Sequence, residues 1–246
     1  MGKVFDFNSL FSTACPLCGA KMGNGSIICQ NCSDHIILEH GQKCTRCGKE
    51  INSCICSFLD LHFDRCVFPF VYGGSVRTGI IELKKNGFQK IAKLFLSDLE
   101  SVLYEEYREL VFDSVCYVPR HISSMRKEGV NSAKTIAGLL SESAGIPMKQ
   151  FLRKIKKTAK QSSLKAVERR KNLNGAFKAF HKKQLNGKNI LLVDDIITTG
   201  ATFNECAKTL KDAGAMSVYC IAVAGTVFSE VHQNEYMQDA LGFALK

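Results

Sequence analysis

The chain has 246 residues, with 33 Lys or Arg against 23 Asp or Glu and a formal net charge of +10 at neutral pH. This length suffices for one α/β core and a small appendage. No apolar run approaches the ~20 residues of a membrane span, and no basic segment followed by an apolar one opens the chain, so we expect a cytoplasmic protein without membrane insertion. The positive charge favours a polyanionic partner or substrate.

A short helix is expected within residues 1–14, and a cysteine-rich segment follows it. Eight of the twelve cysteines lie between Cys15 and Cys56. In a reducing cytosol, closely spaced cysteines bind metal rather than form disulfides. A segment with so few large apolar residues needs a metal ion to fold. The pattern predicts a structural zinc module, most simply with two ions, whose ligands are Cys15, Cys18, Cys29, Cys32, Cys44, Cys47, Cys54 and Cys56.

The simplest pairing gives the first four cysteines to one zinc ion and the last four to a second, and an interleaved pairing is the alternative. Four cysteines per ion leave no open coordination position, so we assign zinc a structural role. His35, His40 and His62 are near enough to be considered as ligands, but the cysteines suffice and we expect these histidines at the surface. The module can brace the larger domain, bind nucleic acid or dock a protein.

From Val67 onward, apolar patterns typical of strands and helices alternate. We expect strands at 67–72, 114–118, 148–152, 175–180, 190–193 and 217–224, and helices at 75–85, 89–110, 131–143 and 202–213. This order predicts an α/β fold with a parallel sheet flanked by helices. The expected domains are the cysteine module at 1–62, the α/β domain at 63–227 and a tail of unknown role at 228–246.

The segment 189–202, NILLVDDIITTGAT, carries the strongest functional signal. Its unbroken apolar run is typical of a strand buried on both faces, and we expect that strand to end at Asp194 and Asp195. Backbone N–H groups at the start of the next helix can hold a phosphate, and the carboxylates can bind sugar hydroxyls or lie near magnesium. An ordinary strand–turn–helix is the alternative. The pattern favours a ribose-phosphate site, with the phosphate at Thr198, Thr199, Gly200, Ala201 and Thr202.

Basic residues elsewhere offer further contacts for an anion. Arg120 and His121 follow the strand that stops at Pro119, where ligand contacts are expected in a parallel sheet. Lys84 and Lys85 fit a functional role and a solvated helix end equally well. The segment 153–173 has nine Lys or Arg against the single Glu168. It can be solvated, cover an anionic ligand or follow a nucleic-acid backbone, although it lacks aromatic residues for base stacking.

Together these segments resemble the ComF family, proteins associated with competence for DNA uptake in bacteria. The resemblance rests on the cysteine pairs and on FPFVYGGSVRTGIIELKKNG, VPRHISSMRKEGVNSAK and VDDIITTGAT. It implies a type I phosphoribosyltransferase-like fold that binds 5-phosphoribosyl pyrophosphate (PRPP) with Mg²⁺. Asp194 and Asp195 would be the catalytic positions at the ribose hydroxyls, and residues 198–202 would hold the 5-phosphate. Arg120 and His121 would lie near the pyrophosphate, and a mobile flap would contribute Lys160, Arg169 and Arg170.

The resemblance favours a role in handling single-stranded DNA during natural transformation, with a competence helicase or translocase as the implied partner. Two alternatives remain: an active phosphoribosyltransferase with an unidentified acceptor, and a PRPP-sensing docking module without catalysis. The chain departs from the arginine-rich pattern of the family at Ser123 and Ser124. This departure reduces the positive charge expected beside a pyrophosphate.

Overall fold

The computed structural model describes residues 14–22, 26–38, 41–54, 56, 60–86, 89–123, 130–158 and 172–226, and every structural statement below concerns these ranges. The expected N-terminal helix, the tail at 228–246, His40, Lys160, Arg169 and Arg170 lie outside them. None of the helices in these ranges combines the length and apolar content that crossing a membrane requires.

The main sheet is parallel throughout, as predicted. Its strand order is β1-β7-β6-β3, and β2 also pairs with β7 beyond the end of β1. The strands are β1 (Arg65–Val67), β2 (Phe70–Val71), β3 (Ser114–Tyr117), β6 (Asn189–Ile197) and β7 (Ser217–Gly225). The carboxyl ends of all these strands therefore meet at one edge, where ligands bind in open parallel sheets.

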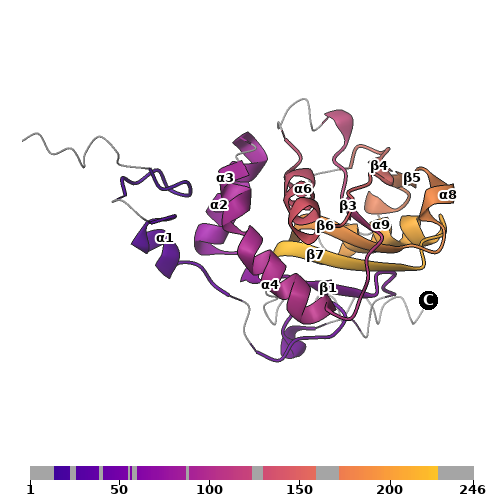
Figure 1. The fold of residues 1–246 in the computed structure, drawn as a ribbon, viewed down its shortest axis with the longest axis horizontal. Coiled ribbons are helices and arrows are strands. Elements are labelled where there is room, and N and C mark those ends of the chain that lie inside the picture. Colours follow the sequence, from indigo (N-terminus) through magenta and orange to yellow (C-terminus); the bar gives the residue numbers. More distant parts are fainter. Residues whose placement is uncertain are drawn as a thin grey trace, which may run out of the picture.

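Helices and a small second sheet cover the two faces of this sheet (Figure 1), with an apolar core under each layer. One core lies under α2 (Gly74–Asn86), α3 (Gln89–Leu94), α4 (Leu96–Tyr107) and α6 (Ser132–Ala144). The other lies under α8 (Lys182–Leu185), α9 (Ala201–Lys211) and a small antiparallel sheet of β4 (Leu152–Lys154) and β5 (Phe177–Ala179). Successive side chains of a strand point to opposite faces, so Leu191 enters the first core and Leu192 the second.

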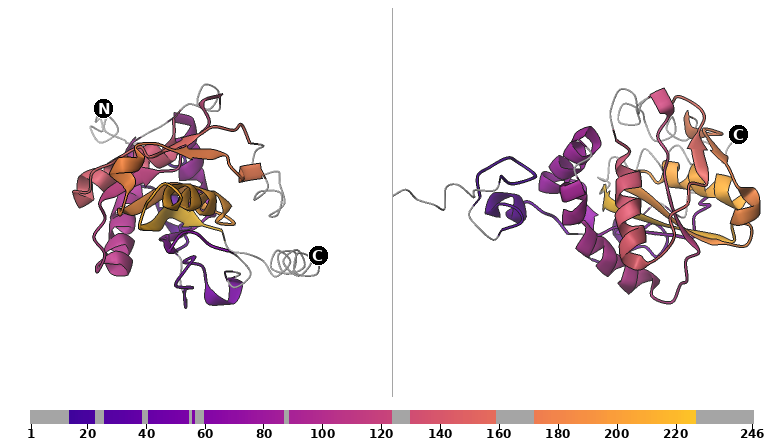
Figure 2. Two further views of the ribbon diagram at one scale, coloured as in Figure 1. Left: turned by 90° about the vertical axis from the view of Figure 1, so that its right-hand side faces the viewer. Right: turned by 45° about the horizontal axis from the view of Figure 1, so that its top comes forward.

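The cysteine-rich segment forms two lobes that contact different parts of the α/β domain (Figures 1 and 2). The first lobe, residues 14–38 with α1 (Gln30–Asp34), lies beside α2, and its Leu17 belongs to the core under α2–α6. The second lobe, residues 41–56 with the 3-10 turn Ile51–Ser53, joins the edge strand β1. There the Cys66 N–H donates to the Arg46 carbonyl at 2.7 Å.

Several expected elements differ in the structure. The strand expected at 67–72 is interrupted by Phe68 and Pro69, because proline has no N–H for the ladder. The helix expected at 89–110 divides at Phe95, whose ring packs against Phe70 with centroids 5.6 Å apart. The strand expected at 148–152 is wrong: Met148 forms one isolated bridge, and β4 begins only at Leu152.

The strand β6 is longer than expected at its functional end. It continues through Asp194 and Asp195 to Ile197, which is in register with Gly225 of β7. The expectation that the strand ends at the two carboxylates is therefore wrong. Because both aspartates are strand residues, their side chains point to opposite faces of the sheet.

Candidate functional site

The eight predicted cysteines gather as two separate groups, Cys15, Cys18, Cys29 and Cys32 (cluster 1) and Cys44, Cys47, Cys54 and Cys56 (cluster 2). Within each cluster the sulfur atoms all lie within 4.8 Å of one another. The Sγ–Sγ distances of 3.6 Å for Cys18–Cys29 and 3.8 Å for Cys47–Cys54 match the tetrahedron edge of about 3.8 Å that Zn–S bonds of ~2.3 Å produce. The grouping follows the simplest pairing rather than an interleaved one.

The surroundings of cluster 2 suit thiolates bound to a cation. The backbone N–H groups of Arg46 and Cys56 each approach a cluster sulfur at 3.4 Å, and such donors stabilise negative charge. A hydrogen bond from the Cys56 thiol lowers the pKa of Cys47 to about 5, and the same contact raises the pKa of Cys56. Four thiols this close cannot all ionise without a compensating cation, and a zinc ion would supply that charge.

The histidines considered as alternative ligands have other surroundings. His35 is exposed, and its Nδ1 lies 2.6 Å from the carbonyl of Asn31. His62 is partly exposed and faces Asp60. Neither belongs to a group of potential metal ligands within the described ranges.

Residues 198–202, called here the phosphate loop, connect β6 directly to α9. Gly200 precedes the first residue of the helix and has a φ of +77°, a left-handed conformation that favours glycine. The Thr199 hydroxyl accepts a hydrogen bond from the Ala201 N–H at 3.2 Å. The first N–H groups of a helix lack partners within the helix, so this turn has the form of an anion-binding site.

Asp195 is fixed on the face covered by α2 and α6. Only 7% of the residue is exposed. Its Oδ1 lies 2.9 Å from the Lys84 ammonium, and its Oδ2 accepts a hydrogen bond from the Ser132 hydroxyl. Lys85 instead pairs with Glu82 on the surface at 3.5 Å. The two adjacent lysines therefore have different partners: Lys84 contacts Asp195 at the site, and Lys85 contacts Glu82 at the surface.

Asp194 lies on the opposite face and is partly exposed. Its Oδ1 accepts a hydrogen bond from the Asp195 N–H at 2.8 Å. Burial, and then the charge of Asp195, raise the pKa of Asp194 to about 7, while Lys84 and Arg120 counteract this rise. Near neutral pH this carboxyl group therefore exchanges between its protonated and ionised forms.

The basic residues predicted around the site have different positions. Arg120 follows β3, donates to the Val130 carbonyl at 3.3 Å and is close enough to influence the pKa of Asp194. His121 makes a local contact at 2.7 Å between its Nδ1 and the Ser123 hydroxyl. Lys154 of β4 is also near Asp194, because burial lowers the pKa of Lys154 and the charge of Asp194 opposes this effect.

A cleft of about 340 Å³ opens beside the phosphate loop. Its lining includes Thr199, Gly200 and Asn204 from the loop and α9, Asp60 and His62 from the segment after cluster 2, and Asn174. Ligand pockets usually measure ~300–1,000 Å³, so this cleft lies at the lower end of that range. The segment after cluster 2 and the expected phosphate site therefore line the same cleft.

Three residues at this site were not predicted. Ser132 begins α6 and contacts Asp195; it lies in a segment that carried the family resemblance, but its own role had no local signal. Lys49 of the second lobe contacts the phosphate loop, and Asn204 contacts residues 60 and 62. Nothing in the sequence distinguishes Lys49 or Asn204 from a lysine or an asparagine exposed at the surface.

Comparison with known proteins matches both parts of the chain. The phosphoribosyl transferase domain model matches residues 95–240, and the double zinc ribbon domain model matches residues 7–63. Competence protein F of Haemophilus influenzae is 33% identical over 108 residues, which cover 43% of this chain and 47% of that protein. The chain thus spans about half the length of this relative.

Competence protein ComFC of Streptococcus pneumoniae is 28% identical over 225 residues, or 83% of this chain and 96% of that protein. Among solved structures, a purine phosphoribosyltransferase from Pyrococcus horikoshii matches with 17% identity and a TM-score of 0.34, over 55% of this chain and 78% of the other. Since the domain model matches more than half of its residues, the chain belongs to the phosphoribosyl transferase domain family, and its competence-protein homologues are those of the ComF type.

Proposed function

We propose that this protein is a ComF-type competence accessory protein that binds a ribose phosphate, PRPP with Mg²⁺, and handles single-stranded DNA during natural transformation. The observation that carries the ligand assignment is the fixed Asp195 carboxylate, held by Lys84 and Ser132 immediately before the phosphate loop. The competence-protein relatives support the biological role.

The two aspartates would contribute differently to ligand binding. Asp194 is partly exposed and would accept hydrogen bonds from the ribose hydroxyls. Both oxygens of Asp195 have protein partners, so it would fix the end of β6 in position. The N–H groups and hydroxyls of residues 198–202 would hold the 5-phosphate. Arg120 and His121 would lie toward the pyrophosphate, with Lys160, Arg169 and Arg170 closing over it.

The eight cysteines would bind two structural zinc ions, one in each of the two lobes that Figures 1 and 2 show. Each lobe packs against a different part of the α/β domain, and neither cluster leaves a coordination position for a substrate. The functional unit would be the zinc module at 1–62 together with the α/β domain at 63–227.

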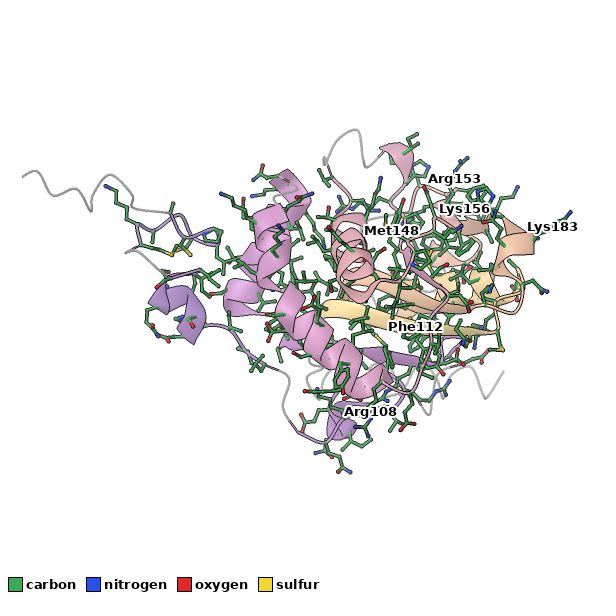
Figure 3. All side chains as sticks on the ribbon, viewed as in Figure 1. Arg108, Phe112, Met148, Arg153, Lys156 and Lys183 are labelled. Carbon is green, nitrogen blue, oxygen red and sulfur yellow. The ribbon has the colours of Figure 1, made fainter. Side chains whose placement is uncertain are left out.

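Single-stranded DNA would bind at the end of the α/β domain where β4 and α8 lie. Figure 3 shows Arg153 and Lys156 together with Lys183 of α8 at this end. Each neutralised phosphate adds a salt-dependent increment to affinity. A competence helicase or translocase would be the protein partner. DNA binding that persists unchanged from low to high salt would contradict this assignment.

Calorimetric titration of the zinc-loaded protein with PRPP and Mg²⁺ tests the ligand site. We expect saturable binding in the wild type and none in the Asp194→Ala/Asp195→Ala double variant, with an exposed control such as Lys85→Ala unchanged. Equal binding by the wild type and the double variant would rule out these carboxylates. No binding by either would rule out the PRPP site.

A phosphoribosyltransferase reaction is the second candidate function. A pKa of about 7 at Asp194 is well matched to proton transfer at neutral pH. This function predicts pyrophosphate release that depends on an acceptor and is lost in Asp194→Asn and Asp195→Ala. PRPP binding without any turnover would instead indicate a sensing or docking role.

A further inference from the structure

The second cysteine lobe contacts the phosphate loop through a buried lysine. Lys49 is only 4% exposed, and its ammonium donates to the Thr198 carbonyl at 2.6 Å and to the Thr226 carbonyl at 2.9 Å. These carbonyls follow the ends of β6 and β7. A buried ammonium group is costly without partners, so this contact strongly favours one relative position of the lobe and the loop.

The backbone of Lys49 belongs to the cluster 2 turn. Its carbonyl accepts a hydrogen bond from the Cys44 N–H at 2.7 Å, and the Gly48 N–H donates to the Cys44 carbonyl at 3.0 Å. A Cβ atom on Gly48 would lie 2.5 Å from the Cys66 carbonyl oxygen, which shows how closely this turn meets β1. The conformation of the cysteine turn therefore sets where the Lys49 ammonium lies.

The Thr198 carbonyl determines the direction of a neighbouring N–H group. In a trans peptide the C=O and the following N–H point in opposite directions. Because Lys49 holds the Thr198 carbonyl toward the second lobe, the Thr199 N–H points away from that lobe. Lys49 thus orients a donor at the start of the expected phosphate site without contacting the phosphate itself.

Asn204 makes a second connection after the phosphate loop. In the first turns of α9, its side chain accepts a hydrogen bond from the His62 N–H at 2.5 Å and donates to the Asp60 carbonyl at 2.9 Å. The aromatic rings of Phe63 and Phe203 pack edge to face at 6.5 Å beside this contact. The cluster 2 turn therefore contacts the start of the phosphate loop through Lys49, and the segment that follows cluster 2 contacts α9, just after the loop, through Asn204.

We propose that Lys49 is a positioning residue that couples zinc loading of cluster 2 to ribose-phosphate binding at the phosphate loop. Zinc at cluster 2 folds the Cys44–Cys47 turn, and Lys49 and Asn204 transmit that order to residues 198–204. Coupling of this kind is reciprocal, so PRPP also increases the affinity of cluster 2 for zinc. The affinity part of the proposal rests on the PRPP site proposed above; the ordering of the loop does not.

Cluster 1 serves as a comparison for cluster 2, because its lobe has different contacts. Its lobe packs on α2, where a Cβ atom at Gly79 would lie 2.8 Å from Leu17. Within the described ranges, the first lobe contacts α2 and also pairs with β2, where the Val71 N–H donates to the Ile37 carbonyl at 2.9 Å, and none of these contacts involves residues 198–204. Loss of zinc from cluster 1 therefore leaves residues 198–204 as they are.

The test compares variants of the full-length zinc-loaded protein. Lys49→Met removes the ammonium but no cysteine, and Lys43→Met is the control in the same lobe. Cys54→Ser/Cys56→Ser disrupts cluster 2, and Cys18→Ser/Cys29→Ser disrupts cluster 1. The readouts are bound zinc per chain, hydrogen exchange of the amides of residues 198–204, and PRPP affinity.

We expect Lys49→Met to retain two zinc ions while exchange at residues 198–204 accelerates and PRPP affinity falls by between about 5- and 150-fold, the usual range of such coupling. The cluster 2 variant should show the same loop changes after losing one zinc, whereas Lys43→Met and the cluster 1 variant should not. Unchanged loop exchange in Lys49→Met, or equal loop changes for the two cluster variants, would overturn the proposal.

If a cysteine variant does not fold, the comparison of Lys49→Met with Lys43→Met still decides the proposal. If the wild type binds no PRPP, the proposed ligand site fails, and hydrogen exchange in Lys49→Met against Lys43→Met still decides whether Lys49 orders the loop. Accelerated exchange with unchanged PRPP affinity would overturn the coupling while leaving the ligand site intact.

Discussion

At the residue scale, Asp194 and Asp195 are neighbours in the chain with different surroundings. Asp195 is enclosed by Lys84 and Ser132 on one face of the sheet. Asp194 is partly exposed on the other face, and its pKa is raised to about 7. Alternation along β6 places them on opposite faces, and the charge of Asp195 still raises the pKa of Asp194.

Lys84→Met should destabilise the protein by about 1–3 kcal/mol, because it leaves the Asp195 carboxylate without its cationic partner. This is less than the loss for a fully buried pair, since 29% of the Lys84 side chain is exposed. Lys85→Met is the matched control and should change stability by less than about 0.5 kcal/mol, as surface pairs contribute little. Urea unfolding measures both, and equal effects of the two substitutions would contradict the assigned role of Lys84.

Asp194→Asn should stabilise the fold at pH 8 and lose this advantage as the pH falls. The folded pKa of about 7 lies above the unfolded value of ~3.9, so the native state binds more protons between these values and wild-type stability falls as pH rises through this window. Asparagine stays neutral throughout. Denaturant unfolding of both proteins between pH 5 and pH 8 measures the difference, and a constant difference would show that Asp194 is not perturbed.

At the element scale, two glycines within helices have opposite surroundings. A Cβ atom at Gly79 of α2 would lie 2.8 Å from both Leu17 and Phe95, whereas one at Gly138 of α6 would have no atom within 4 Å. Gly79 therefore permits close contact between the first lobe and α2. Gly138 contributes no such contact and only increases the entropy of the unfolded chain.

Gly79→Ala should destabilise the protein by about 1–3 kcal/mol through overpacking, and Gly138→Ala should stabilise it by about 0.5–1 kcal/mol through helix propensity. Thermal unfolding of the zinc-loaded proteins gives the sign of each effect. Stabilisation by Gly79→Ala would mean that the first lobe is not packed on α2 as described.

The sequence could predict local elements whose signal lies within a few residues. The apolar run and the turn at Gly200 were sufficient to locate β6, the phosphate loop and α9. The cysteine spacing predicted the zinc ligands and left two pairings open, of which the structure has the simpler one. The break at Phe95 depends on a contact with Phe70 from another element. The β4–β5 pair joins strands separated by a long segment, so its pairing had no local signal either.

The partners of the site residues were harder to predict for the same reason. Lys84 and Lys85 are identical in type and adjacent, and only the position of α2 over the sheet distinguishes them. Lys49 reaches Thr198 across 149 positions of sequence. Contacts of this kind follow from the packed fold and not from residue spacing.

At the scale of the whole molecule, the two cysteine clusters differ in the solvent exposure of their ligands. Cys18 of cluster 1 is exposed, whereas Cys44, Cys47 and Cys56 of cluster 2 are buried. A chelator should therefore remove zinc in two phases, with cluster 1 losing its ion first. The fast phase should be absent from Cys18→Ser/Cys29→Ser and present in Cys54→Ser/Cys56→Ser. Absorbance of a zinc-binding dye follows the release, and a single phase in the wild type would contradict this order.

The central claim is that the carboxyl edge of β6 and the start of α9 bind a ribose phosphate. Hydrogen exchange of the zinc-loaded protein with and without PRPP and Mg²⁺ tests it most directly, because it reports which amides the ligand protects. We predict slower exchange at residues 198–204 in the wild type and no change in the Asp194→Ala/Asp195→Ala variant. Ligand binding that leaves these amides unprotected, or that protects them equally in the variant, would contradict the claim.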